Sequence, residues 1–183
     1  MGSASANPPS FSVEKQVMGV TIENEIGNFQ VGALQAQYGN AVYTHLLIYT
    51  GLVAPVPFRI QSGCELGTVV GDSECDCRPQ LVSAMKYIFE RGNGLIVHTG
   101  QHDGRGRGLL SKLEVYRRRK ETGETSAVAC QRLGIELDHR DFRQFGEILK
   151  YLNIGQVVLL STKREKIEAL RDCGISIAAT VDL

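Results

Sequence analysis

Three cysteines, Cys64, Cys75 and Cys77, constrain the fold more than any other feature of this 183-residue chain. They lie in a short stretch that is rich in glycine and polar residues. The Cys-x-Cys pair can place both sulfur atoms on one side of an extended segment, because alternate side chains share a face. A turn in the preceding residues then brings Cys64 back to the same point. The sequence therefore predicts that three thiols meet at one place in the fold.

Three thiolates are ligands that suit zinc, and a zinc ion held by three protein ligands keeps a coordination position for water. A water in that position ionises near neutral pH, so the three cysteines indicate a hydrolytic metal rather than a structural one. One Zn²⁺ per subunit is the expected cofactor. The alternative is three unrelated reduced thiols, because three-ligand patterns are weaker signals than paired Cys-x-x-Cys motifs.

Composition limits the remaining classes. Twenty basic and twenty acidic side chains cancel, so no global field attracts nucleic acid or a membrane surface. No apolar stretch reaches the roughly 18 residues of a membrane span. Five cysteines, an odd number, favour a reducing cytoplasm over a disulfide framework. Residues 1–12 are expected to be a disordered leader, and Cys130 and Cys173 to be small buried hydrophobic residues.

Hydrophobic periodicity predicts strands first and an alternation of helices and strands afterwards. Strands are expected at 28–35, 40–49, 56–60, 95–98, 157–160 and 175–181, and helices at 79–92, 109–122, 126–133, 142–152 and 164–173. Pro79 suits a first helical turn, because the N–H that proline lacks is not needed there. This order is typical of a single α/β domain over residues 13–183, with a mixed β-sheet and packed helices.

Three other segments carry residues with possible chemistry. The loop from Gly104 to Gly108 contains two arginines and leads into a helix N-terminus, a combination that favours phosphate. In the extended segment around His139, Asp138 and Arg140 are expected to point to the same side. The segment 161–166 joins a strand to a helix and offers hydroxyl and lysine groups to phosphate. The alternatives are, in the same order, a flexible surface loop, a surface ion pair and a capped helix start.

The basic run at 117–120 is interpreted as a solvated helix face.

Taken in order, these motifs resemble those of GTP cyclohydrolase II, the enzyme that opens riboflavin synthesis. The strongest match is Cys64, ten intervening residues and then Cys75-Asp-Cys77, followed by Pro79-Gln-Leu. The run 101–116 is similar to the family's Gln-Glu-Gly-Arg-x-Ile-Gly-Leu-x-Asn-Lys-x-x-x-Tyr. The run 133–142 is similar to its Leu-Gly-x-x-x-Asp-x-Arg-Asp-Tyr/Phe. The resemblance covers the chain from about Thr21 onward.

The resemblance implies a role for each matching residue. The three cysteines match the zinc ligands, Arg140 matches the nucleophile at the α-phosphate, and Asp138 matches its proton acceptor. Tyr116 matches the tyrosine that assists at the purine ring. The positions that match substrate-binding residues are Arg59, Gln80, Gly104, Arg105, Ser161 and Lys166. Asp103, also assigned to substrate binding, stands where the family has Glu. The implied partners are GTP or a related guanine nucleotide, Mg²⁺ with the triphosphate, and a second copy of the chain in a homodimer.

The implied reaction opens the guanine ring. Water activated at zinc attacks C8, formate and pyrophosphate leave, and the product is 2,5-diamino-6-(5-phosphoribosylamino)pyrimidin-4(3H)-one. Some positions depart from the family pattern, among them Gln61 and Gly63 before the first cysteine, and Arg107 in the glycine-rich loop. These departures leave open a variant that stops at the formylated, ring-opened pyrimidine or that uses another guanine nucleotide. A catalytically silent guanine-nucleotide-binding protein and a purely structural zinc are the alternatives of other classes.

Overall fold

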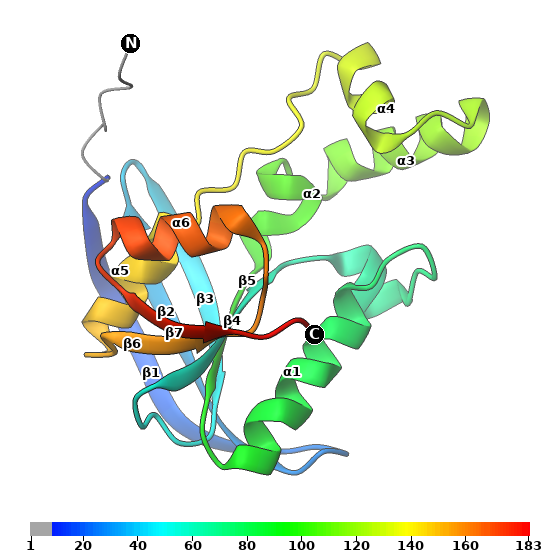
Figure 1. Ribbon diagram of the computed structural model, residues 1–183. Coiled ribbons are helices and arrows are strands. Elements are labelled where there is room, and N and C mark those ends of the chain that lie inside the picture. Colours follow the sequence, from blue (N-terminus) through cyan, green and yellow to red (C-terminus); the bar gives the residue numbers. More distant parts are fainter. Residues whose placement is uncertain (1–8) are drawn as a thin grey trace.

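The computed structural model of the chain describes residues 9–183 (Figure 1). These residues form a seven-stranded sheet in the order β1-β2-β3-β5-β4-β6-β7. The strands are β1 (Phe11–Glu23), β2 (Asn28–Tyr38), β3 (Ala41–Tyr49), β4 (Val56–Ser62), β5 (Leu95–Thr99), β6 (Gln156–Leu159) and β7 (Ser176–Thr180). The pairs β1–β2, β2–β3 and β3–β5 are antiparallel, whereas β5, β4, β6 and β7 run parallel to one another. The predicted mixed α/β sheet is confirmed.

The helices cover both faces of the sheet and extend one end of it. Those described are η1 (Leu66–Val70), α1 (Cys77–Arg91), η2 (Gly100–His102), α2 (Asp103–Gly106), α3 (Gly108–Thr122), α4 (Ser126–Arg132), α5 (Arg143–Tyr151) and α6 (Arg164–Asp172). Helices α5 and α6 lie on one face and α1 on the other, while α3 and α4 project away from the sheet (Figure 1). None of the helices within residues 9–183 has the length and apolar character needed to cross a bilayer.

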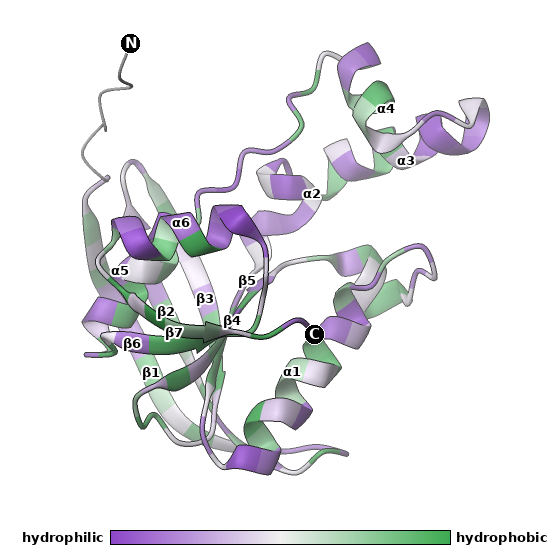
Figure 2. Cartoon of the chain, in the orientation of Figure 1, coloured by the Kyte–Doolittle hydropathy of each residue, from purple (hydrophilic) through white to green (hydrophobic). Residues whose placement is uncertain are grey.

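Strand β5 lies between the two cores, which explains its continuous apolar sequence. Leu95 and Val97 pack towards α5 and α6, and Ile96 packs towards α1, because successive side chains alternate between the faces. All three are fully buried, and each such side chain contributes about 1.5–3 kcal/mol relative to an exposed one. Figure 2 shows hydrophobic residues along the strands and a mainly hydrophilic α2. The strands are held in the core by their buried side chains, whereas the segments that follow them are polar and can supply functional groups to a site.

Helix α5 contributes an amphipathic face to the larger core. Phe145, Ile148 and Leu149 are fully buried at the spacing expected for one face of a helix.

The predicted burial of Cys130 and Cys173 is also confirmed, with exposed fractions of 8% and 6%.

The first strand, β1, is the main element that the sequence patterns do not predict. β1 begins at Phe11, inside the expected leader, and residues 1–8 of that leader lie outside the described residues. Two register shifts against β2, after Val13 and after Val17, interrupt its alternation. A bulge of this kind moves side chains from one face to the other, so a search for strict period-two alternation fails. Helix α1 also differs, since it begins at Cys77 rather than at Pro79.

The parallel pairing of β4 with β5 brings two polar loops together. Ser62 at the end of β4 is in register with Thr99 at the end of β5. The segment to Cys64 follows the first strand, and the glycine-rich segment follows the second. A hydrogen bond of 2.8 Å from the Gly63 amide to the Thr99 carbonyl joins them. The carboxyl ends of parallel strands commonly carry ligand sites in open α/β sheets.

Candidate functional site

A cavity of about 380 Å³ lies beyond the ends of β4 and β5, bounded by α3 and by the segment before α5. It contains most of the residues singled out by the sequence. Those that line it are Cys64, Cys75, Cys77, Asp103, Gly104, Arg105, Tyr116 and Arg140. This cavity, called the cleft below, therefore brings together the cysteine motif, the 101–116 motif and the 133–142 motif.

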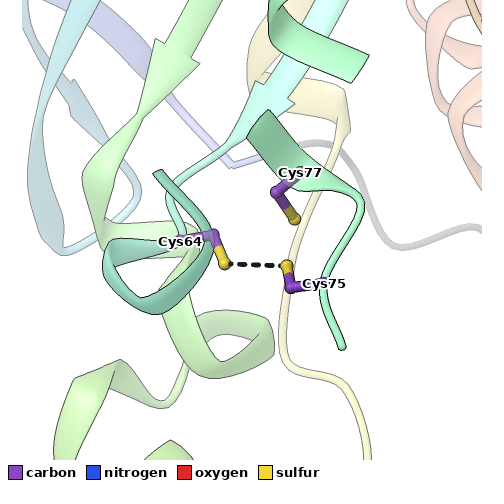
Figure 3. A group of neighbouring side chains, drawn as sticks. All are labelled: Cys64, Cys75 and Cys77. Atoms are coloured by element: carbon purple, nitrogen blue, oxygen red, sulfur yellow. Dashed lines mark hydrogen bonds between the residues drawn. The ribbon is translucent and has the colours of Figure 1, made fainter. Parts of the chain in front are cut away.

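The three cysteine side chains point towards one another (Figure 3). Their sulfur atoms all lie within 4.8 Å of one another, and the Sγ atoms of Cys64 and Cys75 are 3.4 Å apart. Zinc–sulfur bonds of about 2.3 Å in tetrahedral geometry place sulfurs roughly 3.8 Å apart. The three cysteines therefore fit a zinc ion in both donor chemistry and spacing. Their convergence is as predicted, although Cys77 reaches the site from the first turn of α1 rather than from an extended segment.

Gly67 closes the cysteine cluster from one side. A Cβ atom at this position would lie 2.6 Å from the Sγ of Cys75 and 3.0 Å from the Sγ of Cys64. Its backbone N–H donates to the Cys64 Sγ over 3.3 Å. Glycine is required here for close approach and not for backbone conformation. Gly67 is not among the predicted site residues, because its one signal in the sequence is that it is a glycine between two predicted ligands.

Lys112 on α3 adds a positive charge beside the thiols. Its Nζ lies 2.9 Å from the Sγ of Cys64 and 2.9 Å from Oδ1 of Asp103, and both contacts are largely shielded from solvent. Burial raises the pKa of the Cys64 thiol, but hydrogen bonds from Lys112 and Gly67 more than offset this, so the pKa falls. The charged thiolate form is favoured as a result. Lys112 belongs to a matched motif, but it is not among the predicted site residues.

Asp138 and Arg140 form the pair that the sequence predicts. Arg140 Nε lies 2.9 Å from Oδ1, and Nη2 lies 2.5 Å from Oδ2, which is a bidentate arrangement. Burial raises the pKa of Asp138, but the hydrogen bonds from Arg140 lower it by more than burial raises it. The net pKa is therefore below the usual value, and the group is a carboxylate at neutral pH. The remaining nitrogen, Nη1, donates to Ser62 Oγ over 3.2 Å. Arg140 lines the cleft, whereas Asp138 does not.

The glycine-rich loop holds this pair in place. Gly104 and Arg105 both have positive φ angles, 58° and 59°, which is the left-handed region. The Arg105 carbonyl accepts a 2.9 Å bond from the His139 amide, in the middle of the Asp138–Arg140 segment. The expected anion-binding loop is therefore a tight turn. A backbone hydrogen bond joins it to the segment that carries Asp138 and Arg140.

Tyr116 on α3 faces the cysteines from the other wall of the cleft. Its hydroxyl donates to Oδ2 of Asp72 over 2.8 Å. Burial and this carboxylate raise the pKa of Tyr116 to about 12, so the phenol stays protonated. Glu74 pairs with Lys120 and, over 3.4 Å, with Arg119. These contacts attach the loop before Cys75 to α3.

The interpretation of 117–120 as a solvated face is therefore wrong for Arg119. This side chain lines the cleft and pairs with Glu74. Helical spacing places it one turn after Tyr116, on the same side of α3.

Four predicted substrate-binding residues lie outside the cleft lining. Arg59 donates to the Leu160 carbonyl over 2.8 Å and to Gln80 Oε1 over 2.6 Å. Ser161 is buried at the end of β6, and its Oγ accepts a 3.3 Å bond from the Lys163 amide.

Lys166 is the fourth of these residues and has an unusual environment. Its Nζ donates to the Ile60 carbonyl over 3.0 Å, and 8% of the residue is exposed. Burial lowers the pKa of Lys166 to about 7, and the charges of Arg59 and Arg140 add to the effect. Lys166 and Arg140 approach the same Phe142 ring, at 5.7 and 5.0 Å. A buried group of cations thus adjoins the cleft behind Arg140, and it favours an anion nearby.

The two departures before Cys64 have local explanations. Gln61 accepts from Arg59 Nε over 3.3 Å and donates to the Cys77 carbonyl over 3.3 Å. A Cβ atom on Gly63 would lie 2.6 Å from the Gly100 carbonyl oxygen. Glycine therefore permits the close contact between the loops that follow β4 and β5.

These features define an α/β protein with a three-cysteine cluster that could hold a metal ion, beside a cationic cleft. Residues 14–182 match the family described as GTP cyclohydrolase II, and the chain belongs to that family. The expected family assignment is confirmed.

Curated relatives agree with this assignment. The chain is 34% identical over 175 residues to "Riboflavin biosynthesis protein RibBA" of Cytophaga hutchinsonii, covering 94% of this chain and 42% of that protein. It is 40% identical over 129 residues to "GTP cyclohydrolase-2" of Neisseria meningitidis serogroup A, covering 70% of this chain and 64% of that protein. The chain thus spans less than two thirds of the length of these two relatives.

A solved structure of RibBX, a two-domain 3,4-dihydroxy-2-butanone 4-phosphate synthase from A. baumannii, aligns with 98% of this chain and 41% of its own. The sequence identity is 13% and the TM-score is 0.43, so the likeness is weak.

Proposed function

We propose that this chain hydrolyses GTP, opening the guanine imidazole ring at C8 with release of formate and pyrophosphate. The product is then 2,5-diamino-6-(5-phosphoribosylamino)pyrimidin-4(3H)-one. One observation carries the proposal: the cysteine cluster and Arg140 of the Asp138–Arg140 pair face the same cleft. A nucleotide that spans the cleft presents its base to one and its phosphates to the other.

The base end of the cleft is assigned to the cysteines and Tyr116. Cys64, Cys75 and Cys77 would hold zinc, and zinc with three protein ligands lowers the pKa of water in the fourth position. Tyr116 remains a protonated phenol whose hydroxyl donates to Asp72, so it does not act as a base. Lys112 keeps Cys64 charged and so maintains the donor set.

The phosphate end is assigned to Arg140 and the cations around it. An arginine nitrogen attacks a phosphorus atom only after losing a proton, and arginine is otherwise always protonated. Asp138 is the acceptor for that proton, because its carboxylate contacts Nη2 directly. The bond from the arginine nitrogen to the α-phosphorus forms as the bond from that phosphorus to pyrophosphate breaks. Water later hydrolyses the N–P bond and releases the 5′-monophosphate product from Arg140. Arg105 contacts the phosphates, and Mg²⁺ offsets their charge.

Two alternatives differ from this proposal in what they do to the nucleotide. One is a variant hydrolase and the other is a binding protein without hydrolase activity. Gly63 and Gln61 next to the metal centre support a variant that keeps the formyl group or that takes another guanine nucleotide. A silent nucleotide-binding protein would bind GTP and return it unchanged.

Mass spectrometry after incubation with GTP, Mg²⁺ and the zinc-loaded protein separates these functions. The diaminopyrimidine monophosphate together with formate and pyrophosphate supports the proposal. A formyl-retaining product indicates the variant. Unchanged GTP, with nucleotide still bound, would overturn the hydrolase assignment.

A homodimer is proposed on the resemblance and on an exposed row of the sheet. Val17, Ala33 and Leu46 are adjacent across β1, β2 and β3, and Val17 and Leu46 are 55% and 40% exposed. An apolar row without charged members suits a second copy of the same surface. Sedimentation analysis of the parent and of Leu46→Glu tests this, with a dimer converted to a monomer as the expected result. A monomeric parent would remove the proposal.

A further inference from the structure

Two buried polar residues close to Arg140 have no role in the proposed function. His102 at the end of η2 is 3% exposed, and Gln144 in the first turn of α5 is 1% exposed. The imidazole packs edge-on against Phe142 and Phe145, with ring centroids 5.6 and 5.5 Å away. Buried polar groups of this kind are costly unless their hydrogen bonds are satisfied, so their partners indicate what they do.

The contacts of Gln144 determine which imidazole nitrogen carries the proton. Its Nε2 lies 2.9 Å from the Asp141 carbonyl and 2.9 Å from Nε2 of His102. A carbonyl only accepts, so the amide atom that faces it is the nitrogen and not the oxygen. The second N–H of that nitrogen is directed at His102, whose Nε2 must accept. The proton of the neutral imidazole is therefore on Nδ1.

The protonated Nδ1 faces Ser62, which lines the cleft. The distance from Nδ1 to Ser62 Oγ is 3.5 Å, and Nη1 of Arg140 donates to the same oxygen over 3.2 Å. A serine hydroxyl has two acceptor sites and one proton. When His102 and Arg140 occupy both acceptor sites, the hydroxyl proton remains available to the cleft. Burial, together with the charge of Arg140, also lowers the pKa of His102 to about 3, so the ring stays neutral.

We propose that His102 and Gln144 are positioning residues for the phosphate end of the cleft. Gln144 fixes the imidazole tautomer, and His102 then orients the Ser62 hydroxyl as a donor towards an anionic oxygen of the substrate. The same hydroxyl holds Nη1 of Arg140 in the plane set by Asp138. The proposal rests on the phosphate role of Arg140 proposed above, but the tautomer does not depend on that role.

The tautomer is measured directly by NMR of protein labelled with ¹⁵N in its four histidines. The signals of His102 are those lost in His102→Asn. In the parent, Nδ1 is expected to be protonated and Nε2 unprotonated, at every pH at which the protein is folded. In Gln144→Leu the Nε2–H form becomes populated. A parent His102 that carries its proton on Nε2, or that becomes doubly protonated near pH 6, overturns the proposal.

Kinetic measurements separate positioning from packing. Asn at position 102 places an amide N–H where Nδ1–H lies, whereas Leu has a similar size and no donor. With GTP as substrate, we expect His102→Leu to lower kcat roughly 10-fold with KM changed less than about 2-fold, and His102→Asn to stay within about 3-fold of the parent. Equal losses in the two variants, at equal resistance to urea, would mean that the histidine only fills space and would overturn the proposal.

The two proposals fail in different ways. If the parent does not turn over GTP, the proposed function fails, while the NMR experiment still decides whether Gln144 fixes His102. If GTP is turned over and Leu and Asn are equivalent at position 102, the positioning role fails and the proposed function stands.

Discussion

The ammonium group of Lys112 lies 2.9 Å from the sulfur of Cys64 and 2.9 Å from the carboxylate of Asp103. Lys112 thus links the cysteine cluster to the first residue of α2, on which the glycine-rich turn is built. Removal of its charge would leave two anionic groups close together in a buried place. The cysteine cluster and the glycine-rich turn therefore depend on the same cation.

Replacement of Lys112 by methionine is expected to weaken zinc binding. Without the ammonium group, burial and the neighbouring Asp103 raise the pKa of Cys64, so protons compete better with the metal. The loss should be roughly 10- to 100-fold in affinity, the range seen for groups that support metal ligands. Competition with a chelator measures it, and Lys112→Arg, which keeps the charge, should recover most of the affinity. Unchanged affinity in Lys112→Met would contradict the link.

Replacement of Gly67 by alanine should remove the metal altogether. The added methyl group would overlap the sulfur atoms of Cys75 and Cys64, so the ligands cannot converge. Gly155 is a matched control, because a Cβ atom there meets nothing within 4 Å. Elemental analysis should find about one zinc per chain in the parent and in Gly155→Ala, and very little in Gly67→Ala. Full zinc occupancy in Gly67→Ala would show that the cluster can rearrange.

The unusual environment of Lys166 predicts a dependence of stability on pH. Its pKa falls from 10.5 to about 7 on folding, so between these values the unfolded chain binds more protons than the folded one. The free energy of unfolding therefore rises with pH from about 7 to about 10.5 on account of this group, and its contribution is constant below pH 7. The slope should be smaller in Lys166→Met, with metal content held equal in the urea titrations. Identical slopes for both proteins would mean that Lys166 stays charged in the fold.

Sequence patterns predicted the elements whose signals are local. The apolar run of β5 and the spacing of Phe145, Ile148 and Leu149 are visible in a short window, and both give the correct element. The cysteine cluster and the Asp138–Arg140 pair were predicted because each depends on spacing within a short segment. β1 was missed because two register shifts disrupt its alternation.

The supporting residues of the site were missed for a different reason. Lys112 meets Cys64 across 48 positions of the chain, and Gln144 meets His102 across 42. Such contacts depend on how the loops after β4 and β5 pack against α3 and α5. No local sequence pattern indicates that packing. A single sequence therefore identifies residues that can bind metal or substrate, but not the residues that orient them.

The pair at positions 138 and 140 gives a test of the phosphate chemistry. Arg140→Ala removes the proposed nucleophile, and pyrophosphate release should fall by roughly 100-fold or more, in line with the loss of a group aimed at the reacting atoms. Arg140→Lys keeps the charge but loses the two-pronged contact with Asp138, so it should recover little of the activity. Cys75→Ser should instead abolish formate release, because it removes a metal ligand and leaves Arg140 in place. Separate assays of formate and pyrophosphate distinguish these effects. Pyrophosphate release at the parental rate in Arg140→Ala would exclude Arg140 as the nucleophile and would leave it only a binding role.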